Sequence, residues 1–233
     1  MDFHIRSAFD KDLEAVQANV MKMGGLVENA LLRAAEALER KDSALADQIR
    51  QEDRIIDDLE ELIQTECARI IALRSPTASD LRTVLTVMRI CASLERSGDY
   101  AKNLAKRSLV LSGMPEVPGA AGAISRMARS VVALLRDSLD AFASRDATLA
   151  EDVRQRDAEV DQMYNALFRE FLTHMMEDHR TITPCMHLHF IAKNIERVGD
   201  HATGIAEQVI YLVQGHLPEG ERPKVDATQL TDG

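Results

Sequence analysis

The second half of the 233-residue sequence repeats the motifs of the first half. Residues 45–50 read LADQIR and residues 149–154 read LAEDVR, while residues 94–101 read LERSGDYA and residues 195–202 read IERVGDHA. The motifs follow in the same order in both halves, which indicates duplication of one structural unit. We therefore expect two equivalent units, and a site in one unit should occur again in the other.

Apolar residues recur at helical spacing almost throughout the chain. Stripes such as Leu59 to Ile71 and Val131 to Phe142 place them three or four positions apart. Aromatic residues make up only 4% of the chain and Trp is absent, which argues against a large sheet. Breaks are expected at residues 41–43, 74–77, 113–119, 145–146 and 183–184. The pattern predicts an all-α fold of six long helices, arranged as two tandem antiparallel three-helix bundles related by internal duplication.

The same breaks suggest domain boundaries. We expect residues 1–115 to form the first three-helix repeat and residues 116–215 to form the second. The linker around Gly113 to Gly119 contains glycine and proline, which interrupt helices. Residues 216–233 are polar, with Pro218 and Pro223, and we expect them to form a flexible C-terminal tail.

The formal charge of −10, with 38 acidic against 28 basic residues, narrows the choice of partners. Nucleic acid is excluded, because a phosphate polymer would be repelled, whereas a multivalent cation would be attracted. A solvated acidic surface with no ligand is the alternative. Cys67, Cys91 and Cys185 form no C-x-x-C pair, which suits a reducing compartment. With no signal peptide and no long apolar stretch, we expect a cytoplasmic protein without membrane insertion.

Four pairs of acidic residues spaced four apart occupy matching positions in the two halves. Because residues four apart share one helix face, each pair places two carboxylates together, and like charges repel unless a cation lies between them. Two facing helices would supply four carboxylates, which are ligands for divalent or trivalent metal ions. The candidate ligands are Asp53, Asp57, Glu95, Asp99, Asp157, Asp161, Glu196 and Asp200.

Position, rather than number, distinguishes these pairs. With 38 acidic residues in 233 positions, random placement gives about six pairs at this spacing, and the sequence holds about six. The other two, Asp10/Glu14 and Asp57/Glu61, have no counterpart in the duplicate. In contrast, Gly98 and Gly199 each precede an acid of the matched pairs. A glycine inside a helix costs about 1 kcal/mol relative to alanine, which suggests close approach of another helix or of a cluster.

Two further residues extend the candidate site. Asn103, four residues after Asp99, could add an amide oxygen, but the duplicate position holds Gly204. His201 offers an imidazole where the first half has Tyr100, and it suits a ligand and a packing residue equally. The other late histidines, His187 and His189, we interpret as surface or packing residues.

Enzyme classes find no support in the sequence, which has no P-loop, nucleophile elbow or dinucleotide-binding glycine motif. One alternative is a ferritin-like di-metal carboxylate oxidoreductase, but that class uses Glu-x-x-His and the chain has no such motif. Another is a helical scaffold without metal, which metal analysis would identify. We expect a protein that is not an enzyme.

The doubled E-R-x-G-D helix resembles the PhoU family of phosphate-uptake regulators. The likeness spans residues 3–215 and includes the MGGLVE segment at residues 23–28, while Gly204 stands where that family usually has asparagine. The resemblance implies metal clusters of iron or zinc on the acidic pairs and a cytoplasmic, often homodimeric protein. It also implies negative regulation of the phosphate-starvation response and of the high-affinity phosphate transporter. The implied partners are the sensor histidine kinase and the ATPase subunit of the phosphate ABC transporter.

Overall fold

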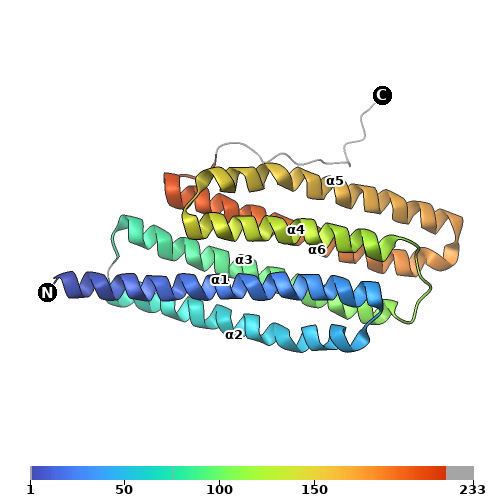
Figure 1. The fold of residues 1–233 in the computed structure, drawn as a ribbon, viewed down its shortest axis with the longest axis horizontal. Helices are drawn as coiled ribbons and strands as arrows, with labels where there is room; N and C mark the ends of the chain where they lie inside the picture. Colours follow the sequence, from blue (N-terminus) through green and yellow to red (C-terminus); the bar gives the residue numbers. More distant parts are fainter. Residues whose placement is uncertain (1, 75, 219–233) are drawn as a thin grey trace, which may run out of the picture.

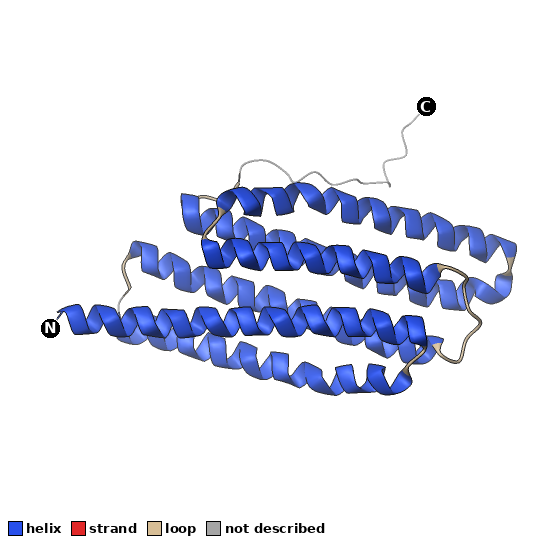
Figure 2. Cartoon of the chain, viewed as in Figure 1, coloured by secondary structure: helices blue, strands red, loops and turns tan. Residues whose placement is uncertain are grey.

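The computed structural model describes residues 2–74 and 76–218 of the chain. This part contains six α-helices and one short 3-10 turn, and it includes no strand (Figure 2). The elements are α1 (Asp2–Arg40), α2 (Ser43–Arg74), α3 (Ala78–Leu111), α4 (Ala120–Ser144), α5 (Ala147–Glu177), η1 (His179–Thr181) and α6 (Ile182–Gln214). The all-α fold predicted from the sequence is confirmed. Residues 219–233, most of the expected tail, lie outside the described residues.

One helix begins earlier than the sequence pattern indicates. The predicted break at Thr183 and Pro184 is wrong, because both residues lie in the first turn of α6 and the chain reverses at Asp178 instead. Proline is tolerated in a first turn because the backbone N–H groups there have no partner within the helix. Asp178 Oδ1 accepts a hydrogen bond from the backbone N–H of Arg180 (2.9 Å), which begins the η1 turn.

The same cap starts the second helix of both repeats. Lys41 and Arg145 each have a φ of 54°, a left-handed conformation that ends the preceding helix. The next residues, Asp42 and Asp146, then accept hydrogen bonds from backbone N–H groups two or three positions later. Such caps stabilise a helix by about 1 kcal/mol. The repeated cap fixes the start of α2 and α5, and with it the helix face that each presents.

The helices form two layers (Figure 1). In one layer α2, α3, α6 and α5 lie side by side in that order, and α1 and α4 pack together over this layer. Each repeat is a three-helix bundle, α1–α3 or α4–α6. The repeats meet where α3 packs against α6 and where α1 packs against α4. Both helix pairs that carry the acidic motifs, α2/α3 and α5/α6, therefore belong to the same four-helix layer.

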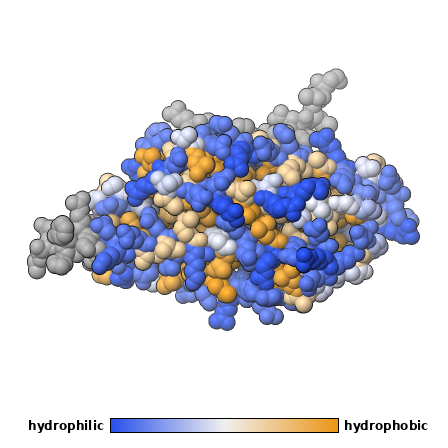
Figure 3. All heavy atoms as spheres, viewed as in Figure 1, coloured by the Kyte–Doolittle hydropathy of each residue, from blue (hydrophilic) through white to orange (hydrophobic). Residues whose placement is uncertain are grey.

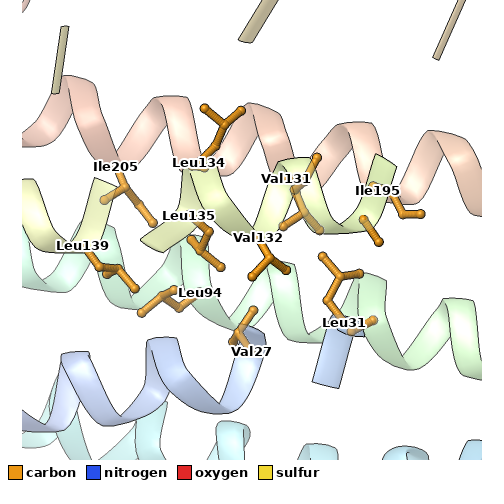
Figure 4. Packing of buried hydrophobic residues seen from close by; sticks show 14 of the residues in the cluster. Val27, Leu31, Leu94, Val131, Val132, Leu134, Leu135, Leu139, Ile195 and Ile205 are labelled. Carbon is orange, nitrogen blue, oxygen red and sulfur yellow. The ribbon is translucent and has the colours of Figure 1, made fainter. Parts of the chain in front are cut away.

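A single apolar core extends through both repeats. Val27 and Leu31 of α1, Leu94 of α3 and Leu139 of α4 are all buried members of one cluster. Figure 4 shows these side chains gathered between helices of the two repeats. Burying each such side chain contributes roughly 1.5–3 kcal/mol. The shared core therefore makes the two bundles one body.

The outside of this body is mixed in character. On the face that carries α1 and α4, hydrophilic residues are interspersed with hydrophobic ones (Figure 3). None of the described helices combines the length and the apolar character that crossing a bilayer requires.

Candidate metal centres

In the first repeat, side chains of α2 pack closely against α3 at Gly98. A Cβ atom on Gly98 would lie 3.0 Å from Ile56 Cδ1 and 3.6 Å from Asp53 Oδ1. The missing side chain therefore lets the carboxylate of Asp53 lie against the α3 backbone, where the residue is only 6% exposed. Glu95 and Asp99 flank Gly98 on the same helix, so the matched acids of α2 and α3 meet here.

A lysine joins the acids of the two helices. Lys102 Nζ lies 2.6 Å from Asp53 Oδ2 on α2 and 3.4 Å from Asp99 Oδ1 on its own helix. The hydrogen bond to Asp53 raises the pKa of Lys102 above its ordinary value. The sequence analysis missed this residue, because a lysine three positions after an aspartate is a common surface pair. Lys102 thus provides an internal counter-charge for the first acidic cluster.

The remaining two acids of the first repeat carry electrostatic strain. Asp57 is exposed. Partial loss of its hydration raises its pKa, and the charges of Asp53 and Asp99 raise the pKa further against the opposing effect of Lys102. Partial burial also raises the pKa of Glu95, with the charge of Asp99 as the next cause. Each carboxylate is therefore harder to ionise than in water, and a bound cation would relieve this cost.

The second repeat reproduces the close approach. A Cβ atom on Gly199 of α6 would lie 3.4 Å from Val160 Cγ1 and 3.5 Å from Asp157 Oδ1 on α5. Asp157 is 2% exposed, which makes it even more buried than Asp53. Asp161 follows one turn later on α5, and Asp200, half-buried, follows Gly199 on α6. Asp157 is thus brought to the contact between α5 and α6, with Asp200 next to Gly199 on the facing helix.

Glu196 is more buried than its counterpart in the first repeat, Glu95. It is buried, and its Oε1 accepts a hydrogen bond from Lys193 Nζ (2.8 Å). Its Oε2 is also buried and has no hydrogen-bond partner among the described residues. A buried polar atom left without a partner costs about 1–3 kcal/mol, more when the group is charged. A cation at this point would remove that cost.

The two additional candidate ligands, Asn103 and His201, differ in their surroundings. Asn103 is exposed one turn beyond Asp99, and a side chain at its counterpart, Gly204, would meet open space. The His201 ring lies against the Tyr100 ring across the α3–α6 contact, with centroids 5.9 Å apart. Burial lowers the pKa of His201, so burial favours the neutral imidazole. These contacts place His201 between the repeats as well as beside Asp200.

The acidic clusters are open arrangements rather than finished coordination shells. In the part of the chain that the structure describes, no three carboxylate, imidazole or thiol groups converge on one point closely enough to hold an ion. Lys102 and Lys193 contact the acids of the two repeats instead. Even so, the glycine cradles, the unpartnered Glu196 oxygen and the all-oxygen donor set fit a hard or borderline cation.

The cysteines take no part in these clusters. Cys67, Cys91 and Cys185 are buried free thiols. Burial raises the pKa of Cys67 to about 11 and the pKa of Cys91 to about 12, so neither forms a thiolate at neutral pH.

Comparison with known proteins shows that the chain is similar to one protein family over both repeats. A family model described as "PhoU domain" matches residues 20–108 and 124–209, one match in each repeat. A Rhizobium meliloti protein named phosphate-specific transport system accessory protein PhoU homolog is 46% identical over 225 residues, which cover 97% of this chain and 95% of the relative. A Caulobacter vibrioides protein of the same name is 42% identical over 226 residues, which cover 97% and 98% of the two chains.

Two crystal structures share the fold. PhoU from Pseudomonas aeruginosa superposes with a TM-score of 0.86 at 41% identity, covering 89% of this chain and all of that one (100%). The phosphate transport system regulatory protein PhoU from Streptococcus pneumoniae superposes with a TM-score of 0.83 at 32% identity, covering 91% and 99% of the two chains.

Proposed function

This chain belongs to the PhoU family, and we propose that it is a metal-binding accessory protein that regulates phosphate transport. The observation that carries the metal part is the repeated close approach: Asp53 lies against Gly98, and Asp157 lies against Gly199. The regulatory part follows the names of the relatives, which are accessory proteins of phosphate-specific transport systems. Regulation by binding, rather than catalysis, is the activity that we assign.

Each repeat would hold metal between its second and third helices. The ligands in the first repeat are Asp53 and Asp57 of α2 with Glu95 and Asp99 of α3, and Asn103 adds an amide oxygen. The ligands in the second repeat are Asp157 and Asp161 of α5 with Glu196 and Asp200 of α6. Oxygen donors accept iron, zinc, manganese, magnesium or calcium, and the family resemblance favours iron or zinc. The bound cation would neutralise the clustered carboxylates.

The lysines give metal binding a structural consequence. For the acids to close around a cation, Lys102 has to leave Asp53 and Lys193 has to leave Glu196, because a cation and an ammonium group repel each other. The freed ammonium groups would then alter the charge of the surface near each site. A partner protein would then bind the metal-loaded and metal-free forms with different affinity, because their surface charge differs.

The partners that we propose are those implied by the family. When phosphate is plentiful, the chain would bind the sensor histidine kinase and the ATPase subunit of the phosphate ABC transporter from the cytoplasmic side. Binding would keep the phosphate-starvation response silent and restrain uptake. A homodimer is the proposed assembly.

A deletion strain tests this function. In phosphate-rich medium, cells lacking the chain should express a phosphate-starvation reporter and take up excess phosphate. Reintroducing the wild-type gene should restore repression of the reporter. Affinity purification of the tagged chain should recover the kinase and the ATPase, more in phosphate-rich than in phosphate-poor medium. Unchanged reporter activity and unchanged uptake after deletion would contradict the proposed regulation.

A further inference from the structure

The second acidic cluster has a neighbour that the pattern of paired acids does not include. Tyr164 lies on α5, seven residues after Asp157 and three after Asp161, so the three side chains share one face of the helix. Tyr164 is half-buried at the contact between α5 and α6. A tyrosine hydroxyl that loses its proton is an anionic oxygen donor, as a carboxylate is. The α5 face that carries the two aspartates thus carries a third oxygen group.

Contacts with α6 place Tyr164 beside the buried acid of this cluster. Lys193 Nζ lies 5.0 Å from the centroid of the Tyr164 ring and 2.8 Å from Glu196 Oε1. Partial burial raises the pKa of the Tyr164 hydroxyl, the charge of Lys193 lowers it, and the charge of Glu196 raises it again. Tyr164 and Glu196 are therefore close neighbours that share one ammonium group.

The same glutamate has a free coordination position. Glu196 is 8% exposed, and its Oε2 has no hydrogen-bond partner among the described residues. Lys193 satisfies the other oxygen, Oε1. Because a buried charged oxygen without a partner is costly, this end of the cluster lacks a cation that the lysine does not supply.

The first repeat has a carboxylate at the matching position. When the repeats are aligned on their acidic motifs, Glu60 corresponds to Tyr164 and is also half-buried. Partial burial and the charge of Asp99 raise the pKa of Glu95, the counterpart of Glu196, and the charge of Glu60 adds to this effect. The position therefore holds an oxygen group beside the cluster in both repeats. The group is a carboxylate in the first repeat and a phenol in the second.

We propose that Tyr164 is a fifth ligand of the second metal centre and that its phenolate makes this centre selective for ferric iron. Phenolate is a hard anionic donor, which suits Fe³⁺ better than the softer Zn²⁺, and tyrosine is known as an iron ligand in haem proteins. On binding, the O–H bond breaks, the proton goes to water, and the oxygen electron pair forms the Fe–O bond. Iron enters as Fe³⁺, so the step needs no oxidant or reductant. The inference rests on the proposed function, because it adds a ligand to a site proposed there.

A packing role for the Tyr164 ring is the alternative. The ring lies 5.7 Å from the His189 ring and holds Lys193 over its face. Phenylalanine offers the same ring to both neighbours and lacks only the hydroxyl oxygen. Tyr164→Phe therefore preserves the packing and removes the proposed ligand atom, so the two roles give different results.

The test uses the full chain, stripped of metal and then loaded with Fe³⁺ supplied as ferric citrate. After removal of free iron, the visible absorption and the iron content are measured on the same sample. A phenolate bound to Fe³⁺ gives a charge-transfer band in the visible range, and resonance Raman excitation in that band shows the ring vibrations of the bound tyrosine. Carboxylate ligands have no such vibrations. A parallel titration with Zn²⁺ measures selectivity.

The small number of tyrosines makes the assignment complete. The chain has three, so Tyr100→Phe and Tyr211→Phe are the matched controls for Tyr164→Phe. Tyr211 lies beneath the Arg82 guanidinium, and Tyr100 lies against the His201 ring. Circular dichroism checks that all variants keep the helical content of wild type.

We expect wild type and both controls to show the band and the tyrosine vibrations, and Tyr164→Phe to lose both. In competition with citrate, one iron site of Tyr164→Phe should bind at least about tenfold more weakly, while Zn²⁺ affinity changes less than about twofold. A band that survives in Tyr164→Phe, or that is lost in a control instead, would overturn the inference. Iron-loaded wild type without the band would overturn it as well.

Iron content distinguishes failure of this inference from failure of the proposed function. Iron retained by wild type without tyrosine vibrations would leave the metal centres in place and remove Tyr164 from them. No retained iron would overturn both. A band that depends on Tyr164, in a protein whose deletion leaves phosphate regulation unchanged, would confirm the ligand and contradict the regulatory role.

Discussion

The ammonium group of Lys102 lies 2.6 Å from Asp53 Oδ2 and so ties α3 to α2 at the first acidic cluster. The second repeat has Thr203, a fully buried residue, at the position equivalent to Lys102. Its ammonium group comes from Lys193, at a position where the first repeat has Ala92, and it contacts Glu196 on the same helix. The two proposed metal sites are therefore similar in their acids and different in their competing cations.

Replacing Lys102 by methionine should show how strongly its ammonium group competes with a metal ion at the first site. Without the competing ammonium group, Asp53 and Asp99 are free to bind a cation, and we expect divalent metal affinity at the first site to rise about tenfold. In the presence of chelator, the variant should be less stable by about 1 kcal/mol, since Asp53 is buried and Lys102 is partly exposed. Titration calorimetry and thermal unfolding measure the two quantities. Lys106→Met, an exposed change one turn along α3, should alter neither, and unchanged affinity in Lys102→Met would argue against competition.

Gly204→Asn should give the second site the amide that the first site has in Asn103. A side chain at Gly204 meets open space, and asparagine is a slightly better helix former than glycine. We therefore expect metal to bind the second repeat several-fold more tightly, with metal-free stability unchanged or raised by a few tenths of a kcal/mol. Titration calorimetry of metal-stripped protein measures the affinity. A weaker or unaltered second site would show that position 204 does not face the metal.

Glu95→Gln should reveal, through the pH dependence of stability, the cost of ionising Glu95, which comes from its partial burial and then from the charge of Asp99. The pKa of Glu95 is raised in the folded protein, so its ionised form destabilises the fold above that pKa and the penalty disappears as the carboxyl takes up a proton. With chelator present, the variant should be more stable than wild type at pH 7 by a few tenths of a kcal/mol.

The gain should shrink as the pH falls through the raised pKa and vanish below 4.5, the ordinary pKa of a glutamate side chain. Chemical unfolding at several pH values measures the difference, with Glu159→Gln at an exposed position of α5 as the control. A gain that grew on acidification would contradict the assigned direction of the pKa shift.

Much of the fold and part of the site could be predicted because the chain is duplicated. Matching positions singled out the eight acids from pairs expected by chance, and the structure places Asp53 at the α2–α3 contact and Asp157 at the α5–α6 contact. The predicted break before α6 was wrong because proline occurs both in breaks between helices and in the first turn of a helix. Sequence spacing alone cannot tell which of these two positions Pro184 occupies.

Contacts between elements were harder to predict. Lys102 was missed because its partner Asp53 lies on another helix, and a sequence shows only the neighbour within its own helix. The contact between Tyr100 and His201 depends on how α3 packs against α6, for which the repeated motif carries no signal.

Adjacent glycines of α1 should respond oppositely to alanine. A Cβ atom on buried Gly24 would overlap Leu139 Cδ1 of α4, whereas one on exposed Gly25 meets nothing within 4 Å. We expect Gly24→Ala to destabilise the chain by about 1–3 kcal/mol, because the core has to shift. Gly25→Ala should stabilise it by about 0.5–1 kcal/mol through helix propensity. Denaturant unfolding measures both, and a stabilised Gly24→Ala chain would show that α1 and α4 are less tightly packed than described.

Metal content after loading with iron or zinc and removal of free ions tests most directly whether acids of neighbouring helices share a cation. The comparison is between wild type, Glu196→Ala/Asp200→Ala and Asp10→Ala/Glu14→Ala, an exposed acidic pair with no counterpart in the duplicate. We expect wild type and the control to retain metal in both repeats. The Glu196/Asp200 variant should lose the metal bound in the second repeat, while its circular dichroism spectrum stays helical. Equal metal content in all three chains, or none in wild type, would contradict the assignment.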